Sequence, residues 1–181
     1  MTYVFNVWIP FLPPGINQQY GRSKIGRVYL KPGARVWKSH AAIVVGARAG
    51  LIDWKDCDKP FSIKIYVVGS KSDADAYIKT VIDTVCTKLG FDDKRIASQS
   101  SEKCKLQFVR DMYCSEEIER IKKEKENRIA MGPEGDDYFK EYITSVYDKN
   151  MEVFLQKMND TKTIDGIKQG VYVKLFPAEE I

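Results

Sequence analysis

Residues 62–90, SIKIYVVGSKSDADAYIKTVIDTVCTKLG, decide the fold. Residues 62–68 alternate between apolar and polar side chains, which predicts a strand with Ile63, Ile65 and Val67 on its inward face. After the break at residues 69–72, apolar side chains recur at the spacing of one face of a four-turn helix. Gly90 is placed to end that helix, whose apolar positions are Ile78, Val81, Ile82, Val85 and Leu89.

Similar patterns lie on both sides of this strand and helix. Residues 3–9 and 103–109 alternate like strands, while residues 34–48 have apolar side chains at helical spacing. Prolines and a glycine interrupt regular structure after residue 9, and residues 17–22 are expected to form a loop. Strands and helices that alternate over about 110 residues predict an α+β domain, a mixed sheet with flanking helices, over residues 1–110.

The character of the chain changes after Arg110. Residues 115–128 are rich in Glu, Lys and Arg, which predicts an exposed helix held by charge pairs. An amphipathic helix is expected at residues 136–158, and alternation at 171–176 predicts a last strand. Residues 111–181 are therefore predicted to be a mostly helical C-terminal extension. Its second helix packs either on its own chain or on a second subunit through Phe139, Ile143, Val146, Phe154 and Met158.

Composition excludes several classes of protein. A hydrophobic share of 44% and a charged share of 30% are typical of a globular chain, not of a disordered one. No apolar stretch is long enough to span a bilayer and no signal peptide is recognisable, so we expect a cytoplasmic protein without a membrane partner. Four cysteines without a CxxC pair and a single histidine predict no zinc site, and no organic cofactor is expected.

Charge is distributed unevenly along the chain. Residues 1–50 contain no Asp or Glu, and a segment with charge of one sign attracts polyanions such as nucleic acids. A solvated basic face is the alternative interpretation, and charge alone does not decide between the two. The basic side chains of this segment are Arg22, Lys24, Arg27, Lys31, Arg35, Lys38 and Arg48.

An acidic cluster lies where the central helix begins. Asp73 and Asp75 are two residues apart, and an extended backbone there points both carboxylates to one side. Asp75, Lys79 and Asp83 follow at i, i+4 and i+8 on the face opposite the apolar one. Carboxylates are suitable ligands for magnesium, and a nearby lysine can stabilise charge in the hydrolysis of a phosphodiester.

Spacing alone leaves another interpretation of these residues open. An aspartate at a helix start can cap free N–H groups and complement the helix dipole, with a gain of about 1 kcal/mol. Asp75 and Lys79 have the spacing of an ordinary helix ion pair, and Asp92-Asp93 after Gly90 is common turn chemistry. Nothing in the sequence brings that turn back toward the helix start.

Three separated blocks resemble the RusA family of Holliday-junction resolvases. The first is the loop PFLPPGINQQY at residues 10–20, which matches the family's proline-rich loop with an Asn and a Tyr. The second is DADAYIK at residues 73–79, which is similar to the family signature D-x-D-N-x-x-K. The third follows the helix, with Asp83 inside it, and consists of Gly90 and then Asp92-Asp93.

The resemblance implies a specific activity and site. Family members are homodimers, many of them encoded by prophages, that cut branched DNA with a magnesium ion, for which manganese can substitute. The three metal-binding carboxylates would be Asp73, Asp75 and Asp93, and Lys79 would be the catalytic cation. DNA would contact Asn17 of the proline-rich loop and four basic residues near it, Arg22, Lys24, Arg27 and Lys31.

The chain departs from the family in two places. Ala76 stands where the family has an Asn, and the short spacing after Gly90 makes Asp92 the alternative to Asp93. The expected function is a Mg²⁺-dependent endodeoxyribonuclease that resolves four-way junctions by paired nicks. The alternatives are a non-catalytic module that binds branched DNA, and a nuclease for flaps or forks.

Overall fold

The computed structural model describes residues 5–49, 60–159 and 169–178. The chain divides into two compact units. The first, which we call the sheet unit, contains residues 1–106 and 168–181, and the second, the helical hairpin, contains residues 107–167.

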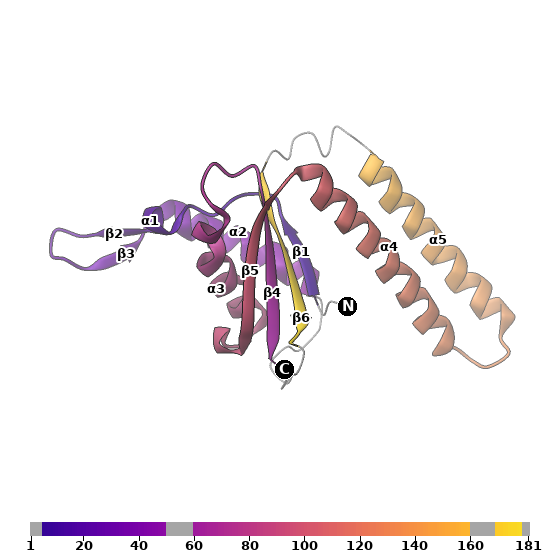
Figure 1. The fold of residues 1–181 in the computed structure, drawn as a ribbon. Coiled ribbons are helices and arrows are strands. Elements are labelled where there is room, and N and C mark those ends of the chain that lie inside the picture. The colour runs from indigo at the N-terminus through magenta and orange to yellow at the C-terminus, as the bar shows by residue number, and fades with distance from the viewer. Residues whose placement is uncertain (1–4, 50–59, 160–168, 179–181) are drawn as a thin grey trace. The chain divides into compact units, whose positions relative to one another are not determined.

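A four-stranded mixed sheet forms the centre of the sheet unit (Figure 1). Its strands are β1 (Phe5–Ile9), β4 (Phe61–Val68), β5 (Ile96–Cys104) and β6 (Gly170–Pro177). The order across the sheet is β1-β6-β4-β5. Strand β6 is antiparallel to both of its neighbours, whereas β4 and β5 are parallel. The final strand of the chain is therefore an interior strand of the sheet.

The position of β6 changes the predicted domain organisation. We expected a single extension over residues 111–181, but β6 belongs to the sheet and only residues 107–167 form a separate unit. The predicted last strand itself is present, and its side chains Val171, Val173 and Leu175 are fully buried. Burial of these apolar side chains in the core explains why the strand belongs to the first unit.

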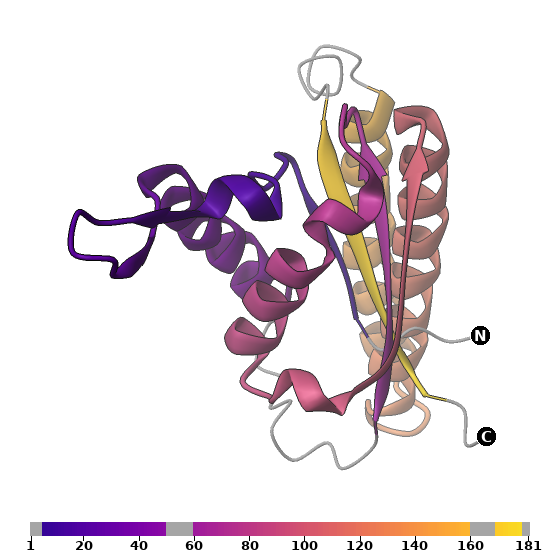
Figure 2. The ribbon, with the colours of Figure 1, turned by 60° about the vertical axis from the view of Figure 1, so that its left-hand side comes forward.

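Two helices cover one face of the sheet (Figure 2). They are α2 (Pro32–Ala49) and α3 (Ile78–Leu89), which pack against each other, and α2 also packs on β1. Gly90 ends α3 with a left-handed backbone (φ 82°) and donates its N–H to the Cys86 carbonyl at 2.9 Å. The predicted class, α+β with a mixed sheet flanked by helices, is confirmed.

Two local predictions were wrong. Residues 103–109 do not continue as a strand, because β4 ends at Val68, which pairs with Cys104, and leaves the following residues without a neighbour. Residues 17–22 are not a simple loop either. They hold the end of α1 (Ile16–Gln19) and strand β2 (Tyr20–Arg22), which pairs with β3 (Val28–Leu30) as a two-stranded ribbon.

The helical hairpin consists of α4 (Leu106–Ala130) and α5 (Asp137–Asn159). Their contacts are antiparallel, since Tyr113 lies against Phe154 with ring centroids 6.3 Å apart and Lys125 forms an ion pair with Asp148 at 2.8 Å. The predicted amphipathic helix over 136–158 is thus confirmed, and its Ile143 side chain is buried. No helix in the described part of the chain combines the length and apolarity needed to cross a bilayer.

Candidate active site: the acidic groove on α3

The segment between β4 and α3 has a defined conformation. Gly69 adopts a positive φ of 72°, and the Ser70 hydroxyl lies 2.8 Å from the Ser72 carbonyl oxygen and 2.9 Å from the Tyr77 hydroxyl. Tyr77 is buried and ends the short helix η1 (Ala74–Tyr77), which leads directly into α3. These contacts fix the backbone that carries the two predicted metal ligands at the start of the helix.

Asp73 and Asp75 do not have the structural roles that the sequence left open. Asp73 is the N-cap residue of η1 with an extended backbone, but its side chain makes no capping hydrogen bond. Among residues 5–49, 60–159 and 169–178, Asp75 and Lys79 form no ion pair with each other or with another side chain. All three side chains are exposed. Neither helix capping nor a helix ion pair therefore accounts for them in this structure.

A groove of about 450 Å³ runs along the polar face of α3, and we call it the acidic groove. Asp75, Lys79 and Asp83 contribute to it from one stripe of the helix, as their spacing predicts. Asp93 contributes from the turn after the helix, so the turn does lie on the same groove as the helix stripe. The remaining lining residues are Ile78, Ile82, Ile96 and Gln99.

The structure distinguishes Asp93 from its neighbour Asp92. The Asp92 carboxylate accepts a hydrogen bond from the backbone N–H of Lys94 at 2.9 Å and caps the short helix η2 (Asp93–Arg95). That backbone N–H holds the pKa of Asp92 below its usual value. Asp92 therefore has a local structural role, whereas Asp93 lines the acidic groove. This difference favours Asp93 as the functional acid of the turn.

The acids of the groove are spread along the helix. Asp75 precedes α3 and Asp93 follows it, and a helix of 12 residues is about 18 Å long. Asp73 does not line the groove. Within the part of the chain that the structure describes, no three His, Cys, Asp or Glu side chains form a group that could hold a metal ion. Within one chain, therefore, two of the three predicted ligands, Asp73 and Asp75, lie at one end of α3, and the third, Asp93, lies at the other end.

The chemistry of these side chains nevertheless fits magnesium. Mg²⁺ keeps several of its waters and binds proteins through one or two carboxylates together with the phosphates of a substrate. Asp73 and Asp75 supply two such carboxylates on one exposed segment, without competing partners among the described residues. Asp73 and Asp75 are therefore the residues at the start of α3 that could hold such an ion together with a substrate phosphate.

The negative charge near the other end of the groove affects a buried thiol. Burial, together with the smaller effect of the negative charges of Asp93, Asp83 and Asp92, raises the pKa of Cys86 to about 12. Cys86 is therefore a protonated core side chain without nucleophilic reactivity.

The proline-rich loop lies against the start of α3. Asn17 lines a second, smaller pocket of about 220 Å³ together with Ser72, Ala76 and Tyr77. Gln19 is buried, and its side-chain amide donates hydrogen bonds to the Pro14 carbonyl at 3.0 Å and to the Thr80 hydroxyl of α3. The structure therefore brings the first and second blocks of the sequence motif together at the end of α3 that carries Asp75.

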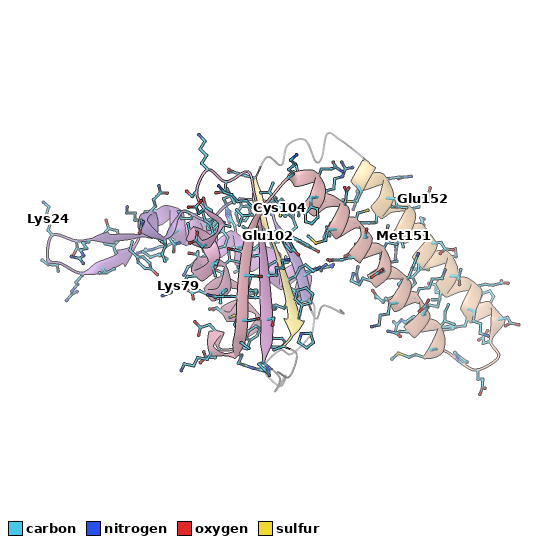
Figure 3. The ribbon with its side chains drawn as sticks, in the orientation of Figure 1. Lys24, Lys79, Glu102, Cys104, Met151 and Glu152 are labelled. Atoms are coloured by element: carbon cyan, nitrogen blue, oxygen red, sulfur yellow. The ribbon has the colours of Figure 1, made fainter. Side chains whose placement is uncertain are left out.

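The four predicted DNA-contacting basic residues lie on or beside the β2–β3 ribbon. Arg22 is in β2, Lys24 and Arg27 are in the turn, and Lys31 follows β3, all of them exposed. Lys24 lies at the end of the ribbon that is farthest from Lys79 of α3 (Figure 3). The basic residues thus form an arm that reaches away from the acidic groove.

Two polar residues of the groove, Asp83 and Gln99, were not among the predicted functional residues. Asp83 could have been found, because it continues the Asp75–Lys79 stripe by one more turn and is half-buried on the groove. Gln99 could not, because residues 98–101 are polar on both faces of an edge strand and give no pattern that points to a site.

A scan of models of known protein families gives no match to this chain, and no curated protein matches it either.

Proposed function

We propose that the chain is a Mg²⁺-dependent endonuclease for branched DNA, with the four-way junction as its substrate and a sheet unit of the RusA type. The observation that carries the proposal is the acidic groove. The exposed carboxylates of Asp75 and Asp93 and the side chain of Lys79 lie on it without ion-pair partners among the described residues. Exposed acids gain nothing by facing the phosphates of DNA unless a cation lies between them.

Each side chain of the site has a role in this proposal. Asp73 and Asp75 would hold the ion at the start of α3. The bound ion would polarise the phosphodiester and lower the pKa of the attacking water. Lys79, one helical turn from Asp75, stabilises the negative charge that develops on the phosphoryl oxygens. Asn17, close to Ala76 in the pocket beside the acids, positions the DNA backbone at this end of the groove.

The separation of Asp75 from Asp93 supports a dimer. A four-way junction has two symmetric scissile phosphates, so a two-fold dimer presents two matching sites. If two copies of α3 run antiparallel across the two-fold axis, the start of each helix lies beside the end of the other. Asp93 of a second copy would then complete the carboxylate set at Asp73 and Asp75, whereas Asp93 of the same chain follows the other end of α3.

Cleavage of a synthetic four-way junction tests the proposed function. We expect paired, symmetric nicks with Mg²⁺ or Mn²⁺, and no cleavage with Ca²⁺ or with a chelator. A linear duplex of the same sequence serves as the control for structure specificity, and flap and fork substrates distinguish a nuclease of another specificity. Tight junction binding without cleavage in any divalent metal would replace this proposal with a non-catalytic binding module.

A further inference from the structure

The β2–β3 ribbon projects from the sheet unit. Both views show it extending away from the sheet and from α2 and α3 (Figures 1 and 2). Its base is fixed, because the Lys31 N–H donates to the Gln19 carbonyl at 2.7 Å and Gln19 is itself bonded to α3. Arg35 of α2 donates from Nε to the Leu30 carbonyl at 3.0 Å. The ribbon is therefore an arm held at its root.

The tip of the arm is a tight turn with an apolar side chain at its end. The Gly26 N–H donates to the Ser23 carbonyl at 2.9 Å, and Gly26 has a φ of 78°, which favours glycine. Ser23 also holds Arg27, whose backbone N–H donates to the Ser23 hydroxyl at 3.1 Å. This turn presents Ile25, which is 76% exposed. Small polar residues are usual in such turns, so a large branched apolar side chain at the tip is unexpected.

The apolar surface continues along the ribbon. Val28 is 63% exposed and the two tyrosines of the ribbon, Tyr20 and Tyr29, are 46% and 44% exposed. The Tyr29 ring lies so close to Gly21 on the paired strand that a Cβ there would be 2.6 Å from it. Gly21 thus allows the Tyr29 ring to lie flat on the ribbon.

Basic side chains surround this apolar surface. Arg22, Lys24, Arg27 and Lys31 are all exposed, and residues 1–50 contain no acidic side chain to balance them. Neither the charge nor the shape of this surface would exclude an apolar protein partner. A cationic rim around an apolar tip matches DNA, however, because the rim can bind phosphates and the tip can contact bases. Proteins that bend DNA insert apolar side chains between base pairs in this way.

We propose that the β2–β3 ribbon is a wedge that inserts Ile25 into an opened base step at the branch point of DNA. This inference rests on the proposed DNA substrate and adds how the chain would recognise a branch. Base pairs at a branch point are the easiest to unstack, so the wedge discriminates branched from linear DNA. Arg22, Lys24 and Arg27 bind the phosphates on both sides of the opened step, and Tyr29 offers a ring for base stacking.

Fluorescence of 2-aminopurine placed at the branch point tests the wedge, because this base becomes brighter when it is unstacked. The protein is added in Ca²⁺ so that binding is measured without cleavage. We expect fluorescence to rise for the wild type on the junction and to stay unchanged on the linear duplex. Ile25→Ser should abolish the rise and weaken junction affinity roughly ten-fold, while Ile25→Leu retains both.

Lys24→Ala is the matched control on the same turn. It should reduce the slope of log affinity against log salt by about 0.9 and leave the fluorescence rise in place at saturating protein. Ile25→Ser should leave that slope unchanged, since it removes no charge. Thermal unfolding of both variants should equal that of the wild type, because both side chains are exposed.

The outcomes separate the wedge from the nuclease. If Ile25→Ser keeps the full fluorescence rise and the wild-type affinity, the wedge is wrong. If it instead lowers the dimer fraction in sedimentation, the ribbon is an interface between copies of this chain, which also overturns the proposal. A wild-type protein that unstacks the branch point but never cuts would refute the nuclease and leave the wedge standing. A wild-type protein that cuts the junction without unstacking the branch point would refute the wedge and leave the nuclease standing.

Discussion

The sheet unit and the helical hairpin differ in how completely they bury their apolar side chains. The sheet unit has a continuous core between its strands and the helices α2 and α3, with residues such as Ile65 and Val81 fully buried. In the hairpin, α4 and α5 bury Ile121 and Ile143, while Tyr138 and Tyr142 remain 81% and 59% exposed. The candidate site lies wholly on the sheet unit. The sheet unit therefore has the more complete hydrophobic core of the two, and we expect it to fold without the hairpin.

The largest effect is expected from removal of β6. A chain that ends at Arg110 loses the strand between β1 and β4, whose three fully buried aliphatic side chains, Val171, Val173 and Leu175, are worth about 1.5 to 3 kcal/mol each. That loss is comparable to the whole stability of a typical domain, about 5 to 15 kcal/mol. We expect no cooperative thermal transition in circular dichroism. Such a truncation therefore does not test the extension by itself.

Excision of the hairpin alone is the matched control. Cys104 and Gly170 both pair with Val68, from its two sides, and two strand spacings make about 10 Å. A short Gly/Ser linker can therefore replace residues 107–167 and keep β6 in the sheet. We expect cooperative unfolding in this shortened chain. If it fails to fold while the chain ending at Arg110 folds, the sheet unit is not the independent part of the molecule.

The next largest effect concerns the two ends of α3. Asp75→Asn and Asp93→Asn should each abolish junction cleavage while leaving junction binding intact or stronger, because each removes a proposed metal ligand and a negative charge near phosphate. If the second copy supplies Asp93, mixing the two inactive proteins creates dimers with one complete site. Nicking should then recover to about a quarter of the wild-type level.

The recovery has a clear alternative outcome. If Asp75 and Asp93 act within one chain, every site in the mixture carries a substitution and nicking stays absent. A mixture of Asp75→Asn with Asp73→Asn is the control, since both residues lie at the same end of α3 and no combination of these chains restores a site.

A smaller effect is expected from Lys79→Ala. The lost electrostatic group should lower the cleavage rate by about 10² to 10³. The side chain is exposed and has no ion-pair partner among the described residues, so the midpoint of thermal unfolding should not change. Rates measured at saturating junction and Mg²⁺, beside a melting curve, check both parts. A parallel loss of stability and activity would make Lys79 a structural residue.

The smallest effect is expected from the exposed face of the hairpin. Tyr142 and Val153 line the groove between α4 and α5 and are partly exposed, as an interface with a second copy requires. The double variant Tyr142→Ser/Val153→Ser should raise the dimer dissociation constant by about ten-fold, the equivalent of 1.4 kcal/mol. Sedimentation measures this, with the exposed Lys149→Ser as the control. An unchanged dissociation constant would assign the hairpin a role other than dimerisation.

Sequence patterns predicted the helices and strands that have one apolar face and one polar face. The apolar stripe from Ile78 to Leu89 gave the bounds of α3, and alternation gave β4 and β6. The pairing of β6 between β1 and β4 could not be predicted, because alternation shows which face of a strand is buried and not which strands are its neighbours. Most of β5 was missed because residues 98–101 are polar on an edge strand with no buried face to reveal it.

The candidate site was predictable to a similar extent. Helical spacing placed Asp75, Lys79 and Asp83 on one stripe, as observed. The choice of Asp93 over Asp92 needed the hydrogen bond from Lys94 to Asp92, which the sequence does not show. The positions of Asp75 before α3 and of Asp93 after it follow from the sequence, but the sequence does not show that both residues line the acidic groove.

The central claim is that the carboxylates at the start of α3 support metal-dependent cleavage of DNA. The most direct measurement compares junction cleavage in Mg²⁺ by the wild type, Asp75→Asn and Asp92→Asn. Asn at position 92 can still cap η2, and Asp92 does not line the acidic groove, so this control should cut at nearly the wild-type rate. The account predicts that Asp75→Asn binds the junction and does not cut it. Cleavage by Asp75→Asn at the wild-type rate would contradict the account.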